Sequence, residues 1–117
     1  MQLLPRLKKL SLVGCPKLTA LPRQIGQETT SLKELQLGDV QSLKVVENLA
    51  FLSECLLIAR CEGIERVSNI PLVRELRITF CPNLRRVEKL GSLEQVWLDE
   101  DMKDLSSLWV PGLKHQR

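Results

Sequence analysis

One motif recurs along the chain and restricts its fold more than any other feature. Residues 7–21 follow the pattern L-x-x-L-x-L-x-x-C-P-x-L-x-x-L, and residues 73–87 repeat it with valine or isoleucine in place of some leucines. Looser copies occupy residues 32–46 and 53–67, and a fifth begins at residue 93 before its spacing slips. Self-similarity with a period of about twenty residues predicts a stack of similar units.

The spacing of the aliphatic residues changes inside each copy. Alternation, as at Leu76 and Ile78, fits a short strand that turns every second side chain inward. The three-residue spacing that follows, as at Cys81, Leu84 and Val87, suits a 3₁₀ or irregular segment that brings the chain back. Because one coil cannot bury both aliphatic stripes alone, we expect coils to stack, with their strands forming a parallel sheet on a concave face.

This combination is typical of leucine-rich repeats, whose period is about 20 to 29 residues. We therefore predict an α/β-type leucine-rich-repeat solenoid, with short parallel strands on the concave face and irregular or 3₁₀ return arms. Residues 1–117 are expected to form a single domain that is a fragment of a longer array. Its repeats are placed approximately at residues 7–31, 32–52, 53–72, 73–92 and 93–113.

The strand of the third repeat has two readings. A strand with Cys55 and Leu57 inward would lie one residue out of step and exchange the inward and outward side chains. Leu56 and Ile58 are preferred as the inward residues, because they keep the spacing to Cys61 that the fourth repeat shows.

Charge and hydropathy exclude several classes of partner. Basic and acidic residues are nearly balanced, at 17 and 14, and no strong basic cluster stands out, so we expect no nucleic-acid partner. Arg6, Lys8 and Lys9 interrupt the apolar run that a secretory signal needs, and no segment is apolar enough for a membrane span. A cytoplasmic setting is therefore expected.

Residues able to support catalysis or bind a metal are sparse. The four cysteines form no C-x-x-C pair and the chain has one histidine, so we predict no metal site and no cofactor. Cys15, Cys61 and Cys81 share one place in the repeat and are interpreted as small buried hydrophobic residues. No nucleophile, base and orienting group occur together, so we predict no catalytic residues and no enzymatic activity.

The Cys-Pro form of the repeat at residues 7–21 and 73–87 resembles that of plant nucleotide-binding leucine-rich-repeat disease-resistance receptors. The tail at residues 108–117, LWVPGLKHQR, resembles the carboxyl-terminal end of such receptors in grasses. The resemblance implies a module that senses pathogen effectors or host targets and restrains an attached nucleotide switch. No phosphate-binding G-x-x-x-x-G-K-[ST] loop is present, so no nucleotide-contacting residue is carried over. A stand-alone adaptor or scaffold, such as a substrate-recruiting subunit of a ubiquitin ligase, is the alternative.

The outward strand residues are the expected protein-binding positions, because they vary without disturbing the core. Arg77, Phe80 and Trp97 are the first candidates, since arginine and tryptophan are enriched among interface hot spots. The alternative is that Phe80 only covers the edge of the sheet and that Arg77 is a solvated charge. The full candidate set on the predicted concave face is Gln36, Leu57, Arg60, Arg77, Thr79, Phe80, Trp97 and Asp99.

The amino-terminal coil is expected to be uncapped, because no polar capping element precedes Leu3 and Leu4. An uncapped coil exposes aliphatic side chains and a strand edge. We therefore expect the chain to associate with itself through this end.

Overall fold

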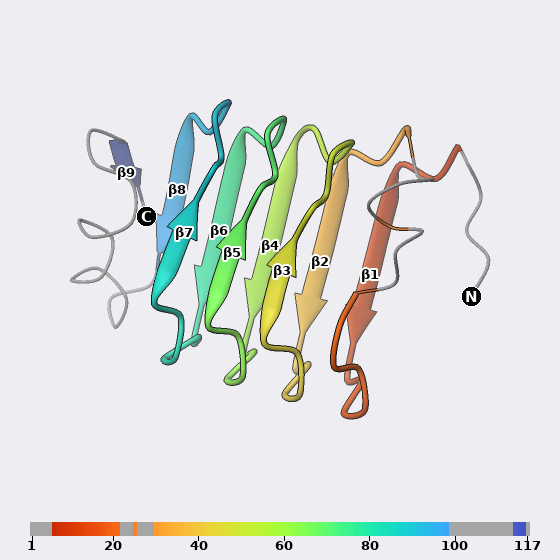
Figure 1. Ribbon diagram of the computed structural model, residues 1–117, viewed down its shortest axis with the longest axis vertical. Coiled ribbons are helices and arrows are strands. Elements are labelled where there is room, and N and C mark those ends of the chain that lie inside the picture. Colours follow the sequence, from red (N-terminus) through yellow and green to blue (C-terminus); the bar gives the residue numbers. More distant parts are fainter. Residues whose placement is uncertain (1–5, 22–24, 26–29, 99–113, 117) are drawn as a thin grey trace.

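The protein is a solenoid of parallel strands (Figure 1). The computed structural model describes residues 6–21, 25, 30–98 and 114–116. Each coil contributes a strand to a long sheet, and the later coils also contribute a strand to a shorter sheet that lies against it. Among the described residues only Ile25 is helical, so the helical part of the predicted α/β type is not seen there. Within the same residues, no helix has the length and hydropathy required to span a bilayer.

The long sheet has six parallel strands. The aliphatic residues at the centre of successive strands are register partners, which places Leu10, Leu35, Leu56, Leu76 and Val96 in one column. Leu56 and Ile58 are fully buried, which confirms the preferred reading of the third repeat. In spatial order the strands are β1 (Lys9–Val13), β2 (Glu34–Gly38), β4 (Cys55–Ala59), β6 (Glu75–Thr79), β8 (Gln95–Leu98) and β9 (Lys114–Gln116).

The return arms differ from the sequence-based expectation, because three of them form a second parallel sheet. Its strands are β3 (Val45–Glu47), β5 (Arg66–Ser68) and β7 (Arg86–Glu88). Backbone groups of these arms bond to the neighbouring coil: Glu65 N–H donates to the Lys44 carbonyl at 2.7 Å, and Arg85 N–H donates to the Glu65 carbonyl at 2.9 Å. A 3₁₀ segment would bond within itself, whereas here the stacking of coils satisfies the backbone.

The core runs between the two sheets as stacked rows of aliphatic side chains. From the second coil to Val96, the inward side chains are at most 8% exposed, and most are completely buried. In the first coil the corresponding side chains are only partly buried. Stability therefore comes mainly from contacts between neighbouring coils. The partly buried residues of the first coil are Leu7, Leu10, Leu12, Cys15, Leu18 and Leu21.

The inward cysteines lie two residues after the ends of long-sheet strands. Cys61 and Cys81 are completely buried, which confirms their interpretation as small core residues. Their thiols lie 3.4 Å and 3.3 Å from the carbonyl oxygens of Ala59 and Thr79, respectively. Cys15 holds the same place in the half-buried first coil.

A left-handed residue turns the chain at the end of most strands. Asp39, Arg60 and Phe80 follow the long-sheet strands with φ of 51°, 56° and 51°. Asn48 and Asn69 follow the short-sheet strands with φ of 60° and 53°. Aspartate and asparagine tolerate this conformation better than most residues, and the Asn69 side chain also donates a hydrogen bond to Asn48 Oδ1 at 2.7 Å.

Two neighbouring coils approach closely at Gly63. A Cβ atom at this position would lie 2.3 Å from the Gln41 carbonyl oxygen, which is too close for any side chain. The Gln41 side chain joins the same coils, because its Nε2 donates to the Arg60 carbonyl at 2.8 Å and its Oε1 accepts from Glu62 N–H at 3.3 Å. Glycine is therefore required here by packing against the preceding coil.

Candidate functional site

The outward face of the long sheet presents three rows of side chains that the core does not use. Alternation along each strand turns them away from the buried column. The middle row holds the residues expected from the sequence. By strand register, the first row is Lys9, Glu34, Cys55, Glu75 and Gln95, the middle row is Ser11, Gln36, Leu57, Arg77 and Trp97, and the third row is Val13, Gly38, Ala59 and Thr79.

Arg77 and Trp97 lie side by side on β6 and β8. The Arg77 guanidinium carbon is 5.3 Å from the centroid of the Trp97 ring, within the range of a cation–π contact. Arg77 also pairs with the carboxylate of Glu75 on its own strand, and this hydrogen bond raises the pKa of Arg77. The pair with Glu75 therefore holds the guanidinium over the Trp97 ring, and Arg77 remains exposed to solvent.

Phe80 and Arg60 occupy a different part of the surface. Both follow the long-sheet strands at left-handed corners, and Phe80 is 54% exposed. They line a hollow of about 290 Å³, here called the corner hollow, whose residues are Asp39, Gln41, Arg60, Glu62 and Phe80. Phe80 therefore lines a hollow apart from Arg77 and Trp97, with which the sequence grouped it.

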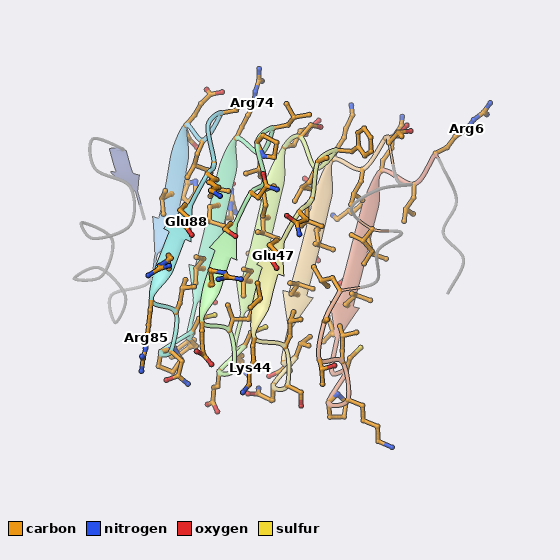
Figure 2. All side chains as sticks on the ribbon, viewed as in Figure 1. Arg6, Lys44, Glu47, Arg74, Arg85 and Glu88 are labelled. Carbon is orange, nitrogen blue, oxygen red and sulfur yellow. The ribbon has the colours of Figure 1, made fainter. Side chains whose placement is uncertain are left out.

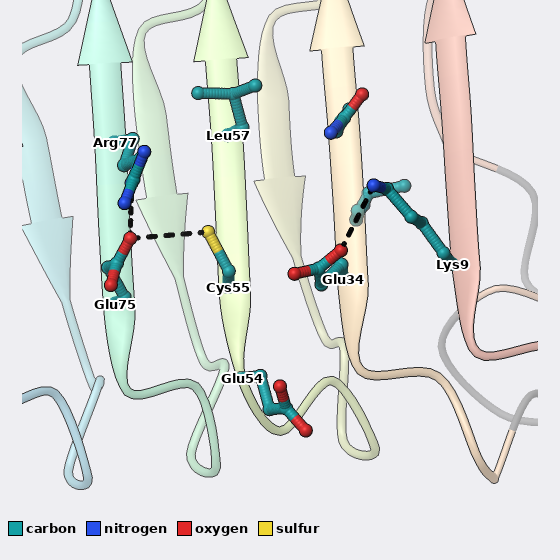
Figure 3. A pocket seen from close by; sticks show the side chains of 9 residues that line it. Lys9, Glu34, Glu54, Cys55, Leu57, Glu75 and Arg77 are labelled. Carbon is teal, nitrogen blue, oxygen red and sulfur yellow. Dashed lines mark hydrogen bonds and ion pairs between the residues drawn. The ribbon is translucent and has the colours of Figure 1, made fainter.

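A second hollow lies over the first strand residues and is here called the strand hollow (Figure 3). It has a volume of about 310 Å³. Ion pairs cross it, including Lys9 Nζ to Glu34 Oε2 at 3.4 Å. Its residues are Lys9, Glu34, Leu35, Gln36, Glu54, Cys55, Leu57, Glu75 and Arg77. Of the predicted positions, this hollow contains Gln36, Leu57 and Arg77.

The first-row residues of the strand hollow were missed by the sequence reasoning. Lys9, Glu34, Cys55 and Glu75 each stand one residue before an inward aliphatic residue. The same alternation that selected the middle row also turns these side chains outward. The signal is therefore present in the sequence, two residues before the middle row of each strand.

Cys55 lies in the strand hollow between two acidic neighbours (Figure 3). Its thiol is 3.8 Å from Glu75 Oε2 and is placed to donate to it. Burial, followed by the negative charges of Glu75 and Glu34, raises the pKa of this thiol to about 11. The thiol is therefore protonated at neutral pH and is a poor nucleophile.

The remaining sequence-predicted positions are less informative. Thr79 is half-buried in the third row of β6. Asp99 lies outside the described residues. Among the residues that the structure describes, no group of three or more His, Cys, Asp or Glu side chains is arranged to hold a metal ion.

The opposite face of the solenoid carries mixed charges on the short sheet (Figure 2). Arg66 on β5 pairs with Glu47 on β3 at 3.2 Å. Arg86 and Glu88 are exposed on the neighbouring strand β7. This face supplies control positions of the same residue types, on the same coils, for any test of the outward face of the long sheet.

Comparison of the chain with protein-family models, curated proteins and solved structures finds no match. The arrangement of the outward face is therefore the basis for a functional proposal. That face joins a guanidinium stacked on an indole, two hollows lined by charged side chains, and a thiol that stays protonated.

Proposed function

We propose that this chain is a leucine-rich-repeat module that binds a protein partner through the outward face of its long sheet and catalyses no reaction. The observation that carries the proposal is the exposed Arg77 guanidinium, stacked at 5.3 Å on the ring of Trp97 next to a hollow of about 310 Å³. Arginine and tryptophan are enriched at interface hot spots. The inward residues already form the core, so these side chains are available for recognition.

The proposed cellular role is recognition within a plant innate immune receptor. The Cys-Pro repeats at residues 7–21 and 73–87 support this role, since they resemble the repeats of disease-resistance receptors. The partner would be a pathogen effector, a host target of an effector, or another part of the same receptor. The four free cysteines are compatible with a reducing, cytoplasmic setting.

Two observations support binding without catalysis. The outward thiol of Cys55 has a pKa of about 11, so little thiolate forms near neutral pH. The acidic side chains beside it are engaged by cations, Glu34 by Lys9 and Glu75 by Arg77. Paired side chains of this kind suit a recognition surface.

The proposal is tested by comparing one substitution on the two faces. Arg77→Glu changes the outward face of β6, and Arg86→Glu makes the same change on β7 of the short sheet. Each variant and the wild-type chain are used as bait in a two-hybrid screen against plant and pathogen libraries. We expect Arg77→Glu to lose specific partners that Arg86→Glu retains, while circular dichroism of both stays unchanged. Retention of every partner by Arg77→Glu would overturn the proposal.

A further inference from the structure

The first strand of the long sheet, β1, has a partner strand on one side only, which is β2. Gly14 N–H, just after β1, donates to the Gly38 carbonyl at 2.9 Å, so the even-numbered residues here direct their backbone groups to β2. Successive residues of a strand direct these groups to opposite sides, so Lys9, Ser11 and Val13 direct theirs to the free edge. No backbone group in the part of the chain that the structure describes bonds to them. Such an edge is a template for another extended segment.

The core is also incomplete on the free side of β1. Leu10 and Leu12 are only partly buried, whereas their register partners Leu35 and Leu37 are at most 1% exposed. The difference arises because β2 has a neighbouring strand on both sides. A further strand with aliphatic side chains opposite Leu10 and Leu12 would complete their burial.

The positive charge of the chain is concentrated in its first residues. Residues 1–27 contain five basic and no acidic residues, whereas residues 28–117 contain 12 basic and 14 acidic residues. A second copy brings the same charges to the edge, so two such ends meet only against their mutual repulsion. An acidic segment is instead attracted. The exposed basic residues of the first coil are Arg6, which projects from the chain just before β1 (Figure 2), Lys8, Lys9 and Lys17.

Opposite charges alternate along the row of residues that immediately precede the long-sheet strands. Lys33 Nζ pairs with Glu54 Oε2 at 3.5 Å, and Arg74 Nε pairs with Glu94 Oε2 at 3.2 Å. Lys8 holds this place in the first coil, next to Lys33, whose N–H donates to the Lys8 carbonyl at 2.7 Å. Lys8 makes no ion pair with a described residue. An acidic residue on the free side of Lys8 would continue the alternation.

We infer that β1 binds an acidic and aliphatic extended segment of a partner protein as an additional parallel strand, with an acidic residue opposite Lys8 and aliphatic residues opposite Leu10 and Leu12. In this mode of recognition the backbone bonds supply affinity and the alternate side chains supply specificity. The parallel direction continues the charged row and the aliphatic rows together. The edge is separate from the outward face, so binding there does not depend on the proposed function.

The probe is the peptide Glu-Glu-Val-Thr-Val-Thr, blocked at both ends. Its first glutamate lies opposite Lys8 and its valines lie opposite Leu10 and Leu12. The peptide is titrated into the isotopically labelled full chain, and hydrogen exchange of the backbone amides is measured with and without it. We expect the Ser11 and Val13 amides to exchange at least several-fold more slowly when the peptide is bound, because they gain a hydrogen bond. Binding should weaken as salt is added.

Three matched peptides separate charge, alternation and direction. Gln-Gln-Val-Thr-Val-Thr lacks the negative charges. Glu-Glu-Thr-Val-Thr-Val has the same composition as the probe, but its aliphatic residues are shifted by one position and point to the other face. Thr-Val-Thr-Val-Glu-Glu has the reversed order. Each should bind at least several-fold more weakly than the probe.

Variants of the chain assign the binding to the edge of β1. Lys8→Gln should weaken the probe by about two- to fivefold. Lys44→Gln removes the same charge from an exposed position in another coil and should leave the affinity unchanged. Ser11→Pro removes an N–H from the free edge and none of the bonds to β2, so it should abolish protection of Val13. The amide spectrum of the later strands shows that this variant is folded.

Any one of four results would overturn the inference. They are unchanged exchange of the Ser11 and Val13 amides with the probe, equal binding of the neutral peptide, equal weakening by Lys8→Gln and Lys44→Gln, and exclusion of the probe by a second copy of the chain. The two-hybrid comparison of Arg77→Glu with Arg86→Glu concerns the outward face. Failure at the edge of β1 is therefore distinguishable from failure of the proposed function.

Discussion

Truncation of Leu76 is expected to destabilise the solenoid far more than truncation of the adjacent Arg77. Leu76 is completely buried and is the register partner of Leu56 on one side and Val96 on the other. Leu76→Ala therefore leaves a void that opens the contact of its coil with both neighbours. Arg77 points the other way, and its side chain is 51% exposed.

The expected magnitudes differ enough to be separated in one experiment. Removal of a buried leucine side chain costs about 2–5 kcal/mol of unfolding free energy, including the cavity that remains. Arg77→Ala removes an exposed ion pair and a ring contact, which together are worth about 1 kcal/mol or less. Because a domain of this size has a stability of about 5–15 kcal/mol, the first change is a large fraction of the total.

Urea unfolding followed by far-ultraviolet circular dichroism measures both variants against the wild-type chain. The difference between the two losses should be at least about 1 kcal/mol, with Leu76→Ala always the less stable. Equal losses, or a greater loss for Arg77→Ala, would refute the inward and outward assignment of β6.

Four further predictions concern backbone, pH and assembly. Gly63→Ala should lower the melting temperature, because its Cβ would lie 2.3 Å from a backbone oxygen. Gly91→Ala should not lower it, because no atom lies within 4 Å of a Cβ at that position. Equal effects of the two substitutions would contradict the close approach at Gly63. Lys89→Gly should raise the unfolding free energy by roughly 1 kcal/mol, because Lys89 has φ of 59°; a loss in urea unfolding would contradict this. The pKa of Cys55 is raised from 9.0 to about 11, so the folded state holds this proton more tightly than the unfolded state does. The wild-type chain should therefore lose stability relative to Cys55→Ala as pH rises from about 9 to about 11. A constant difference across that range would count against the burial of this thiol. Sedimentation should show concentration-dependent association through the half-buried first coil, and a monomer at every concentration would argue against it.

The inward column was predictable because two periods in the sequence agree. Alternation within a copy determines which side chains point inward, and the number of residues between copies determines which residues are register partners on neighbouring strands. In the third repeat, only the spacing to Cys61 distinguishes the register with Leu56 inward from the register shifted by one residue, and Leu56 is buried. Where both periods were present, the structure follows them.

The second sheet was not predictable from the same pattern. Each of its strands has three residues with one inward aliphatic side chain at the centre, which is Val46 in β3, Val67 in β5 and Val87 in β7. A single inward residue leaves no alternation to read, and its three-residue spacing suits a 3₁₀ segment equally well. Each arm becomes a strand because its backbone bonds to the arm of the neighbouring coil, and this bonding exists only once the coils are stacked.

The candidate site was predictable in part. Register alone placed Arg77 beside Trp97, and the structure brings the two into contact. The corner at Phe80 was not predictable, because phenylalanine does not favour a left-handed conformation. That conformation separates Phe80 from Arg77 and places it in the corner hollow with Arg60.

Cross-linking between coils tests the central claim most directly, which is that the strands stack in register and display one outward row. In a Cys55→Ser background, Gln36→Cys and Leu57→Cys lie on adjacent strands as register partners, whereas Gln36→Cys and Arg77→Cys lie two strands apart. Adjacent strands are about 4.8 Å apart, within the range of a disulfide, and strands two apart are about 9.6 Å apart, beyond it. The account predicts rapid oxidation of the first pair alone, measured by mass spectrometry. Failure of that pair, or equal oxidation of the second, would contradict it.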